Sequence, residues 1–159
     1  MTVKSASLRE ELQQARPFES PAHEAILALN RTTDLLRQKI AGVVEPHGIS
    51  PQQYNVLRIL RGAGKAGMPT LDIADRMVEK APGITRLLDR LESKHLVRRR
   101  RCPKDRRQVL CWITEAGLKL LAELDTPVAE MGPHLLRPLN GSEIGALIEM
   151  LNRIRSGLR

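Results

Sequence analysis

The sequence contains few cysteines, few aromatic residues and no long apolar run. Its two cysteines, Cys102 and Cys111, are too few for a disulfide-rich scaffold, and their spacing does not fit a zinc site. Aromatic residues make up 2% of the chain, so aliphatic side chains must fill the core, which favours helices. No stretch approaches the roughly 18 apolar residues of a membrane span, and the N-terminus has no signal-peptide pattern. We therefore expect a cytoplasmic protein that does not enter the membrane.

Sequence patterns that indicate catalysis or metal binding are also missing. There is no H-E-x-x-H, G-x-S-x-G or P-loop motif, and the four histidines lack metal-ligand spacing. The segment 62–67 matches G-x-G-x-x-G, but a helix precedes it and Met68-Pro69 follows, whereas a dinucleotide site needs a strand before and a helix directly after. We predict a turn there, and we expect no enzyme activity, no cofactor and no metal. For the two cysteines, an incidental buried thiol is a better interpretation than a redox switch.

Positive charge is concentrated in one short stretch. The net charge of the chain is +8. Between Arg86 and Arg107 lie ten basic and three acidic side chains, which accounts for seven of the eight net charges. Such a concentration is typical of a surface that binds a polyanion. Scattered lysines on an ordinary basic protein would not produce it.

The first half of the chain is predicted to be helical. Residues 1–20 form an N-terminal extension in which Ser7 and Glu10 are placed as a capping box for a short helix. From residue 22 to 44 the apolar residues follow helical spacing, and the stretch 46–48 ends that helix. Ser50 and Gln53 form a second capping box, with Pro51 at the first helical position.

The middle of the chain has the pattern of a helix-turn-helix. Thr70 is expected to cap a short helix, and Pro82 to open the next one. In this second helix one face is apolar (Ile84, Leu87, Leu88 and Leu91) and the opposite face carries Gly83, Arg86, Asp89, Arg90 and Ser93. Two short helices, the second with a basic exposed face, are the arrangement that places a recognition helix in the major groove.

A β-hairpin is predicted directly after this helix. The runs 96–102 and 109–113 favour strands, and the polar segment 103–106 between them favours a turn. Alternate side chains of Arg98 to Arg101 must point to opposite faces of a strand, so at most two of the four can face DNA. The others are expected to pair with acids on a neighbouring helix.

The C-terminal part is again helical. Thr114 is predicted to cap a helix that Pro127 and Gly132-Pro133 interrupt. Asn140 and Glu143 resemble another capping box, and an amphipathic helix with a regular apolar stripe follows to the C-terminus. The predicted fold is therefore mainly α with a small β-hairpin wing: a winged helix-turn-helix at 49–113, flanked by helical regions at 21–48 and 114–159.

The order of these parts, together with local motifs, resembles the MarR family (multiple antibiotic resistance regulators) over residues 22–157. The most specific match is Thr85-Arg86-Leu87-Leu88-Asp89-Arg90-Leu91-Glu92, followed by Leu96-Val97, Asp105-Arg106-Arg107 and Ile113-Thr114-Glu115-Ala116-Gly117. In the family these segments are the recognition helix, the start of the wing, its tip and the helix after it. His95 stands where the family usually has glycine, and Pro127 is expected to kink a helix that usually runs straight.

The resemblance implies a cytoplasmic homodimer that regulates transcription. The flanking helices of both subunits would form the dimerisation region, and the two recognition helices would enter successive major grooves of a palindromic operator on double-stranded DNA. Relatives respond to small lipophilic molecules or to oxidants, so a small-molecule effector is a further expected partner, at a site that the sequence does not identify. Repression is the mode that the resemblance favours. The alternative is a winged-helix module that binds an acidic protein without specific DNA binding.

We select eleven residues as candidates for DNA contact. On the recognition helix they are Pro82, Gly83, Thr85, Arg86 and Arg90, and on the wing they are Arg98, Arg100, Lys104, Asp105, Arg106 and Arg107. The start of the helix would bind phosphate, and Arg86 would pair with guanine, unless Asp89 holds it in an intrahelical pair. Arg107 would enter the minor groove. Asp105 either orients Arg107 or simply forms the turn.

Overall fold

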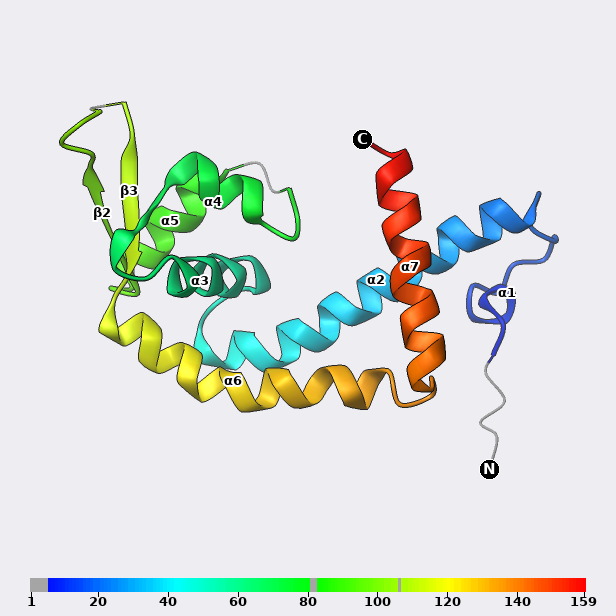
Figure 1. Cartoon of the computed structure of the whole chain (residues 1–159). Helices are drawn as coiled ribbons and strands as arrows, with labels where there is room; N and C mark the ends of the chain where they lie inside the picture. The colour runs from blue at the N-terminus through cyan, green and yellow to red at the C-terminus, as the bar shows by residue number, and fades with distance from the viewer. Residues whose placement is uncertain (1–5, 81–82, 106) are drawn as a thin grey trace.

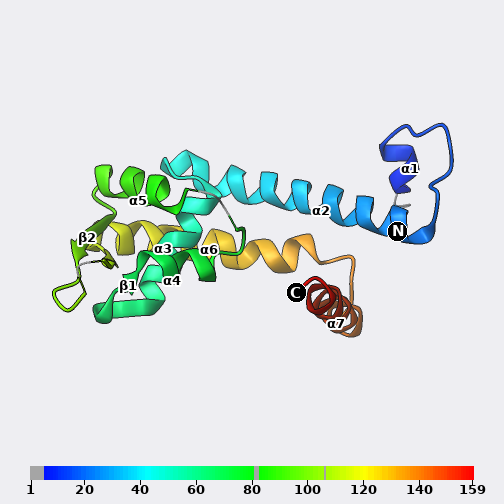
Figure 2. The same cartoon turned by 90° about the horizontal axis from the view of Figure 1, so that it is seen from above.

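The computed structural model describes residues 6–80, 83–105 and 107–159. Within these ranges helices dominate, and a small sheet lies at one end of the molecule (Figure 1). Two long helices, α2 (Pro21–Val44) and α6 (Glu115–Leu135), extend from the sheet-containing unit towards the opposite end. They run alongside each other when seen from above, and α7 (Gly141–Gly157) lies beyond the end of α6, where it is viewed nearly end-on (Figure 2).

Local sequence determines where most helices begin. The predicted capping boxes are present at the starts of three helices: Ser7 with Glu10 for α1 (Leu8–Glu11), Ser50 with Gln53 for α3 (Pro51–Ala63), and Asn140 with Glu143 for α7. Thr114 caps α6 as predicted, because its hydroxyl accepts a hydrogen bond from the Gly117 N–H at 3.1 Å. These caps satisfy amide groups that have no partner within the helix.

A winged helix-turn-helix follows α2 and the short 3₁₀ helix η1 (Glu45–His47). It contains α3, α4 (Thr70–Arg76), α5 (Ile84–Ser93) and the antiparallel strands β2 (Val97–Arg101) and β3 (Val109–Ile113). The predicted hairpin is therefore confirmed. His95, between α5 and β2, has a φ of 59°. This is the left-handed conformation, which glycine adopts most readily.

The start of α4 differs from the prediction. Thr70 does not cap α4, because its N-cap residue is Pro69 and no side chain caps it. The Thr70 hydroxyl instead donates to the Val109 carbonyl at 3.3 Å. This contact lies beside a third strand that the sequence did not predict, β1 (Met68–Pro69), which pairs with β3 so that the sheet order is β1-β3-β2. Two residues are too few to give a recognisable alternation of apolar and polar side chains.

The glycine-rich segment 62–67 is only partly a turn. Gly62 and Ala63 belong to α3, and the 3₁₀ helix η2 (Gly64–Ala66) follows. Gly67 has a φ of 70°, and an added Cβ there would lie 2.4 Å from the indole of Trp112. Glycine at this position therefore serves packing against the sheet. No strand leads into this segment in the described part of the chain, so it lacks the context of a dinucleotide site.

The predicted interruptions of the helix after Thr114 are wrong. α6 continues through both Pro127 and Pro133 to Leu135. A proline removes one amide donor from the helix, which for Pro127 leaves the carbonyl of Glu123 without its usual partner. Pro127 and Glu123 are both exposed, so water can bind the Glu123 carbonyl instead.

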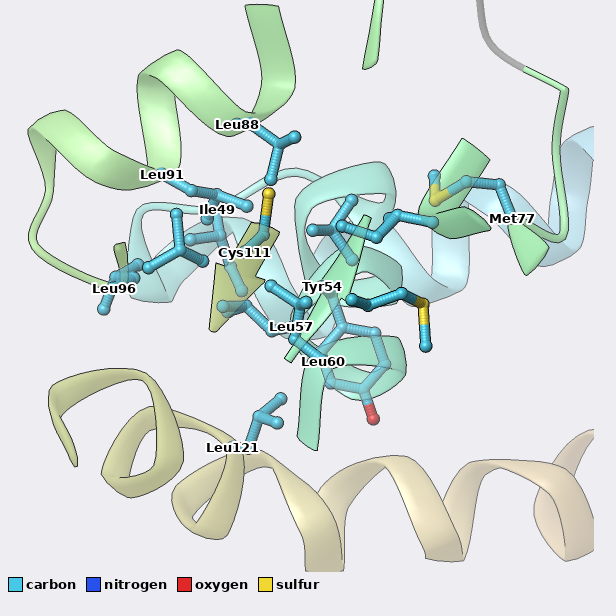
Figure 3. Packing of buried hydrophobic residues seen from close by; sticks show 14 of the residues in the cluster. Ile49, Tyr54, Leu57, Leu60, Met77, Leu88, Leu91, Leu96, Cys111 and Leu121 are labelled. Atoms are coloured by element: carbon cyan, nitrogen blue, oxygen red, sulfur yellow. The ribbon is translucent and has the colours of Figure 1, made fainter. Parts of the chain in front are cut away.

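The hydrophobic core lies in the winged unit. Leu57 and Leu60 of α3, Leu88 and Leu91 of α5, and Leu121 of α6 are fully buried (Figure 3). Cys111 of β3 is also fully buried among them. Because Leu121 and Leu124 complete this core, the first half of α6 is packed into the winged unit.

At the end of the molecule opposite the sheet, by contrast, several apolar side chains are exposed to solvent. No residue of α7, all of which is described, is buried. Ile148 and Ile154 of its apolar stripe are 54% and 46% exposed, and Ile26 of α2 is 58% exposed. A single subunit therefore leaves the apolar faces of both helices in contact with water.

Candidate nucleic-acid interface

The exposed face of α5 carries the predicted recognition residues. Gly83 is the N-cap residue, with a φ of 99°, and the helix starts at Ile84. Thr85, Arg86 and Arg90 are exposed, whereas Leu88 and Leu91 on the other side are fully buried in the core. Pro82, which was predicted to open the helix, lies outside the described residues. The structure thus brings four of the five predicted helix residues to one exposed end and face.

The four arginines of β2 divide between the two faces of the hairpin. Val97 is buried and Arg99 half-buried on the face towards α5, while Arg98 and Arg100 are exposed on the face away from it. The guanidinium of Arg98 stacks on the ring of its cross-strand neighbour Trp112, 5.2 Å from the centroid. Arg98 and Arg100 are therefore not brought together with the recognition residues of α5.

Arg99 pairs with acidic residues of α5. The sequence predicted such pairing for those arginines of the run 98–101 that do not face DNA, without saying which they are. Its Nε donates to Glu92 Oε2 at 2.9 Å, and its Nη2 donates to the same oxygen at 2.6 Å and to Asp89 Oδ1 at 2.5 Å. Burial opposes the charge of Arg99, but the hydrogen bonds to Glu92 and Asp89 outweigh it and raise the guanidinium pKa. The alternative in which Asp89 pairs with Arg86 is therefore not the arrangement in this structure.

The wing tip is shaped by Asp105. Its side-chain Oδ1 accepts a hydrogen bond from the backbone N–H of Arg107 at 3.0 Å, and its carbonyl accepts one from Gln108 at the same distance. Asp105 thus forms the turn and fixes the backbone of Arg107 at the same time, which combines the two predicted roles. Arg107 and Lys104 are exposed, and Arg106 lies outside the described residues.

Three elements meet around a hollow of about 560 Å³ between the helices and the wing. Thr85 of α5 and Arg107 of the wing both line it, so residues 22 positions apart in the sequence face one space. The start of α4 contributes Leu71, which is 76% exposed, and Asp72. The sequence did not identify α4 as part of this surface, because the two exposed residues that line the hollow, Leu71 and Asp72, carry no basic charge.

A second, smaller cavity of about 190 Å³ lies where α2, α3 and α6 meet the segment after α4. Its lining is largely apolar, with Ile40, Met77 and Val128, and it includes Tyr54 and the guanidinium-bearing Arg58. The sequence could not indicate this cavity, because its residues come from four separate segments.

The wall of this cavity is held in place by polar contacts. Glu79, which lines it, accepts from Arg37 Nε of α2 at 2.9 Å and from Gln52 of α3 at 3.4 Å. The N–H of Val78 donates to the side chain of Asn55 at 2.9 Å. The stretch 77–80 that leads towards α5 is thus attached to both α2 and α3.

Neither cysteine forms a disulfide. Cys111 is fully buried, and burial raises the pKa of its thiol against the smaller opposing effects of the Thr70 hydroxyl and the Arg99 charge. Cys102 is partly exposed at the end of the wing. In the described ranges no cluster of side chains could hold a metal ion, and none of the helices is long and apolar enough to cross a membrane.

Comparison with known proteins relates this geometry to transcription regulators. Residues 49–109 match the family model described as MarR family. A solved MarR transcription factor from Planctomyces limnophilus is 43% identical, with a TM-score of 0.66, over 86% of this chain and 98% of that one. The HTH-type transcriptional regulator MhqR of Bacillus subtilis is 29% identical over 80% of this chain and 87% of its own. The HTH-type transcriptional repressor MdtR of the same species is 32% identical over 57% of each chain.

Proposed function

This chain belongs to the MarR family and is a DNA-binding transcription regulator, and we propose that it represses transcription as a homodimer on a palindromic operator. The observation that carries the proposal is the convergence of exposed Thr85 and Arg107 from α5 and the wing on one hollow surface. Repression is supported by the similarity to a repressor of Bacillus subtilis.

We assign the DNA contacts by element. The start of α5, at Gly83 and Thr85, presents amide groups to phosphate, and Arg86 and Arg90 reach into the major groove of double-stranded DNA. Arg107 enters the minor groove, with its backbone fixed by Asp105, and Lys104 contacts phosphate. Pro82, directly before Gly83, and Arg106, next to Arg107, stay among the proposed contacts on their positions in the sequence alone, with Arg106 assigned to phosphate. Arg98 and Arg100 face away from α5, so we assign them at most phosphates beside the groove.

The second subunit covers the apolar faces of α7 and the outer part of α2. Exposed Ile148 and Ile154 lie on α7, and exposed Ile26 lies near the start of α2, at the end of that helix away from the winged unit (Figures 1 and 2). A twofold pair that buries them places one winged unit at each side, which suits two half-sites one helical turn apart. We therefore assign residues 21–48 and 114–159 to dimerisation and residues 49–113 to DNA binding.

The cavity of about 190 Å³ is the candidate effector site. Its lining is largely apolar and includes Arg58, while the negative charge of Glu79 is already paired with Arg37, so the cavity suits a small lipophilic molecule that carries a negative charge. Its wall, the stretch 77–79, leads towards α5. An effector seated there would act on the recognition helix through this stretch.

Binding measurements test the proposed function. A duplex selected by the protein from a random pool, and a scrambled duplex of equal composition, are titrated by fluorescence anisotropy at several salt concentrations. We expect an inverted repeat in the selected sequence, a preference of roughly 10³-fold or more over the scrambled duplex, and an affinity that falls steeply with salt. Equal binding to both duplexes would contradict sequence-specific recognition and favour the protein-interaction alternative.

A further inference from the structure

The contacts of Arg99 link the wing to the recognition helix. Its side chain, 21% exposed, reaches both Asp89 and Glu92, and its own backbone N–H donates to Glu92 Oε1 at 3.0 Å. Glu92 therefore receives three hydrogen bonds from this single residue of β2. Such a planar guanidinium fork fixes the orientation of its partners as well as their charge.

These contacts decide what the acids of α5 can do. Asp89 lies three residues after Arg86, a spacing at which the two side chains are neighbours on a helix and would attract each other. In the structure Asp89 is 2.5 Å from Arg99 instead. Across the described ranges no carboxylate lies within ion-pair distance of Arg86 or Arg90. The charges of both exposed arginines are thus left available to a ligand.

We propose that Arg99 is a positioning residue for DNA binding: it holds Asp89 and Glu92 against the wing and thereby leaves Arg86 and Arg90 free for DNA. The inference rests on the proposed function, since it concerns the same surface. It assigns a role to a residue that contributes no direct DNA contact. Without Arg99, Asp89 would be free to capture Arg86, and two uncompensated carboxylates would lie beside the phosphate backbone.

The geometry argues against the alternative that Arg99 itself binds a phosphate. Its Nε and Nη2 are already directed to carboxylates, and four-fifths of its side chain is covered. Arg99 does line the hollow between α4, α5 and the wing, however, so its charge lies near the proposed DNA surface. An experiment must therefore separate direct contact from positioning.

Salt dependence makes that separation. Each phosphate contact contributes about 0.9 to the slope of log K against log salt, so losing one contact in each subunit lowers the slope by about two for a dimer. We expect Arg99→Met to weaken binding to the selected duplex on the order of tenfold with an unchanged slope. Lys104→Ala, at an exposed residue that we assign to phosphate, serves as the reference for a direct contact and should lower the slope.

A double-mutant cycle tests the link to Asp89. If Arg99 acts by holding this acid, Asp89→Asn should restore much of the affinity in the Arg99→Met background and improve the wild-type protein far less. Far-UV circular dichroism melting checks that each variant is folded. Should Arg99→Met unfold, Arg99→Lys replaces it, because lysine keeps the charge but cannot hold both carboxylates in a fork.

Two results would overturn the inference: a slope that falls by about two with Arg99→Met, or Asp89→Asn effects that are equal in both backgrounds. Either could occur while the wild-type protein still binds an inverted repeat selectively, in which case the proposed function stands. Failure of the wild-type protein to bind DNA with steep salt dependence would overturn both proposals together.

Discussion

Among the basic residues of the interface, contacts within the protein distinguish roles that charge alone does not. Arg98 stacks on Trp112, Arg99 is held by two acids, and Arg107 is exposed on a backbone fixed by Asp105. An arginine whose backbone is fixed and whose side chain has no acid partner loses little backbone entropy on binding DNA and gives up no ion pair. On the wing, Arg107 meets this description.

We predict that Arg107→Ala weakens operator binding by about 1–3 kcal/mol in free energy, with little change in thermal stability. The loss of binding follows from the proposed minor-groove contact, and stability should be kept because the side chain is exposed in the folded protein. Anisotropy titration and circular dichroism melting measure the two effects. An unchanged dissociation constant would remove Arg107 from the contacts.

The two thiols should differ in reactivity. Cys111 is fully buried and its thiol pKa is raised, while Cys102 is partly exposed. In Cys102→Ser, we expect a disulfide reagent to modify Cys111 only when the protein unfolds, because the thiolate is the reacting form. Cys111 stays protonated in the folded state, so it stabilises the fold below the thiol pKa of the unfolded chain, and this contribution is lost as pH rises through the raised folded value. Equal labelling rates in the folded and denatured protein would contradict this.

At the scale of elements, the start of α6 lies close enough to the turn between α5 and β2 to form hydrogen bonds with its backbone. The Leu96 carbonyl accepts from the Thr114 N–H at 3.1 Å, and the Thr114 hydroxyl donates to the His95 carbonyl at 2.7 Å. The turn after the recognition helix is therefore attached to the first residues of α6.

A substitution of Gly117 can test how closely α6 approaches the backbone at Leu96. A Cβ there would lie 2.4 Å from the Leu96 carbonyl oxygen and 2.7 Å from Ile113. We predict that Gly117→Ala lowers the free energy of unfolding by about 1–3 kcal/mol, because a backbone neighbour cannot move aside easily. Urea denaturation measures the change.

Gly62→Ala is the matched control for this prediction. Gly62 lies in a helix of the same unit, and nothing lies within 4 Å of an added Cβ. Alanine there should raise the free energy of unfolding by about 0.5–1 kcal/mol through better helix propensity. The predicted clash would be refuted if the two alanine variants had equal stability.

For the whole molecule, the exposed apolar side chains of α2 and α7 form the surface of the proposed dimer. A charge at Ile148, which is 54% exposed in the subunit, would be buried without compensation in the proposed dimer. We predict that Ile148→Asp sediments as a monomer. Binding to the palindromic duplex should weaken about 100-fold or more, because the two winged units no longer bind as one body.

The neighbouring exposed residue provides the control for the dimer prediction. Glu149→Gln should leave both the sedimentation coefficient and the operator affinity unchanged. It replaces an exposed polar side chain by another of the same size, and such surface substitutions disturb little. A dimeric Ile148→Asp protein with full affinity would show that α7 does not form the subunit interface.

The sequence by itself determined the features that depend on residues a few positions apart. The capping boxes at Ser50 and Asn140 and the hairpin with its turn at residues 103–106 were predicted, and the structure confirms them. Each arises from an interaction of one residue with the backbone within about four positions. Such interactions form in the same way whatever the rest of the fold does.

Only the tertiary structure decided which distant groups meet. Strand alternation limited the DNA-facing arginines of 98–101 to two, but it could not identify Arg99 as the partner of Asp89 and Glu92. Thr70 was taken for a cap because its actual partner, Val109, lies 39 residues away. α6 continues through Pro127 at a position exposed to water, although a proline within a sequence usually indicates the end of a helix. These outcomes depend on how helices and strands pack against one another, and the packing of distant segments has no signature within a short stretch of sequence.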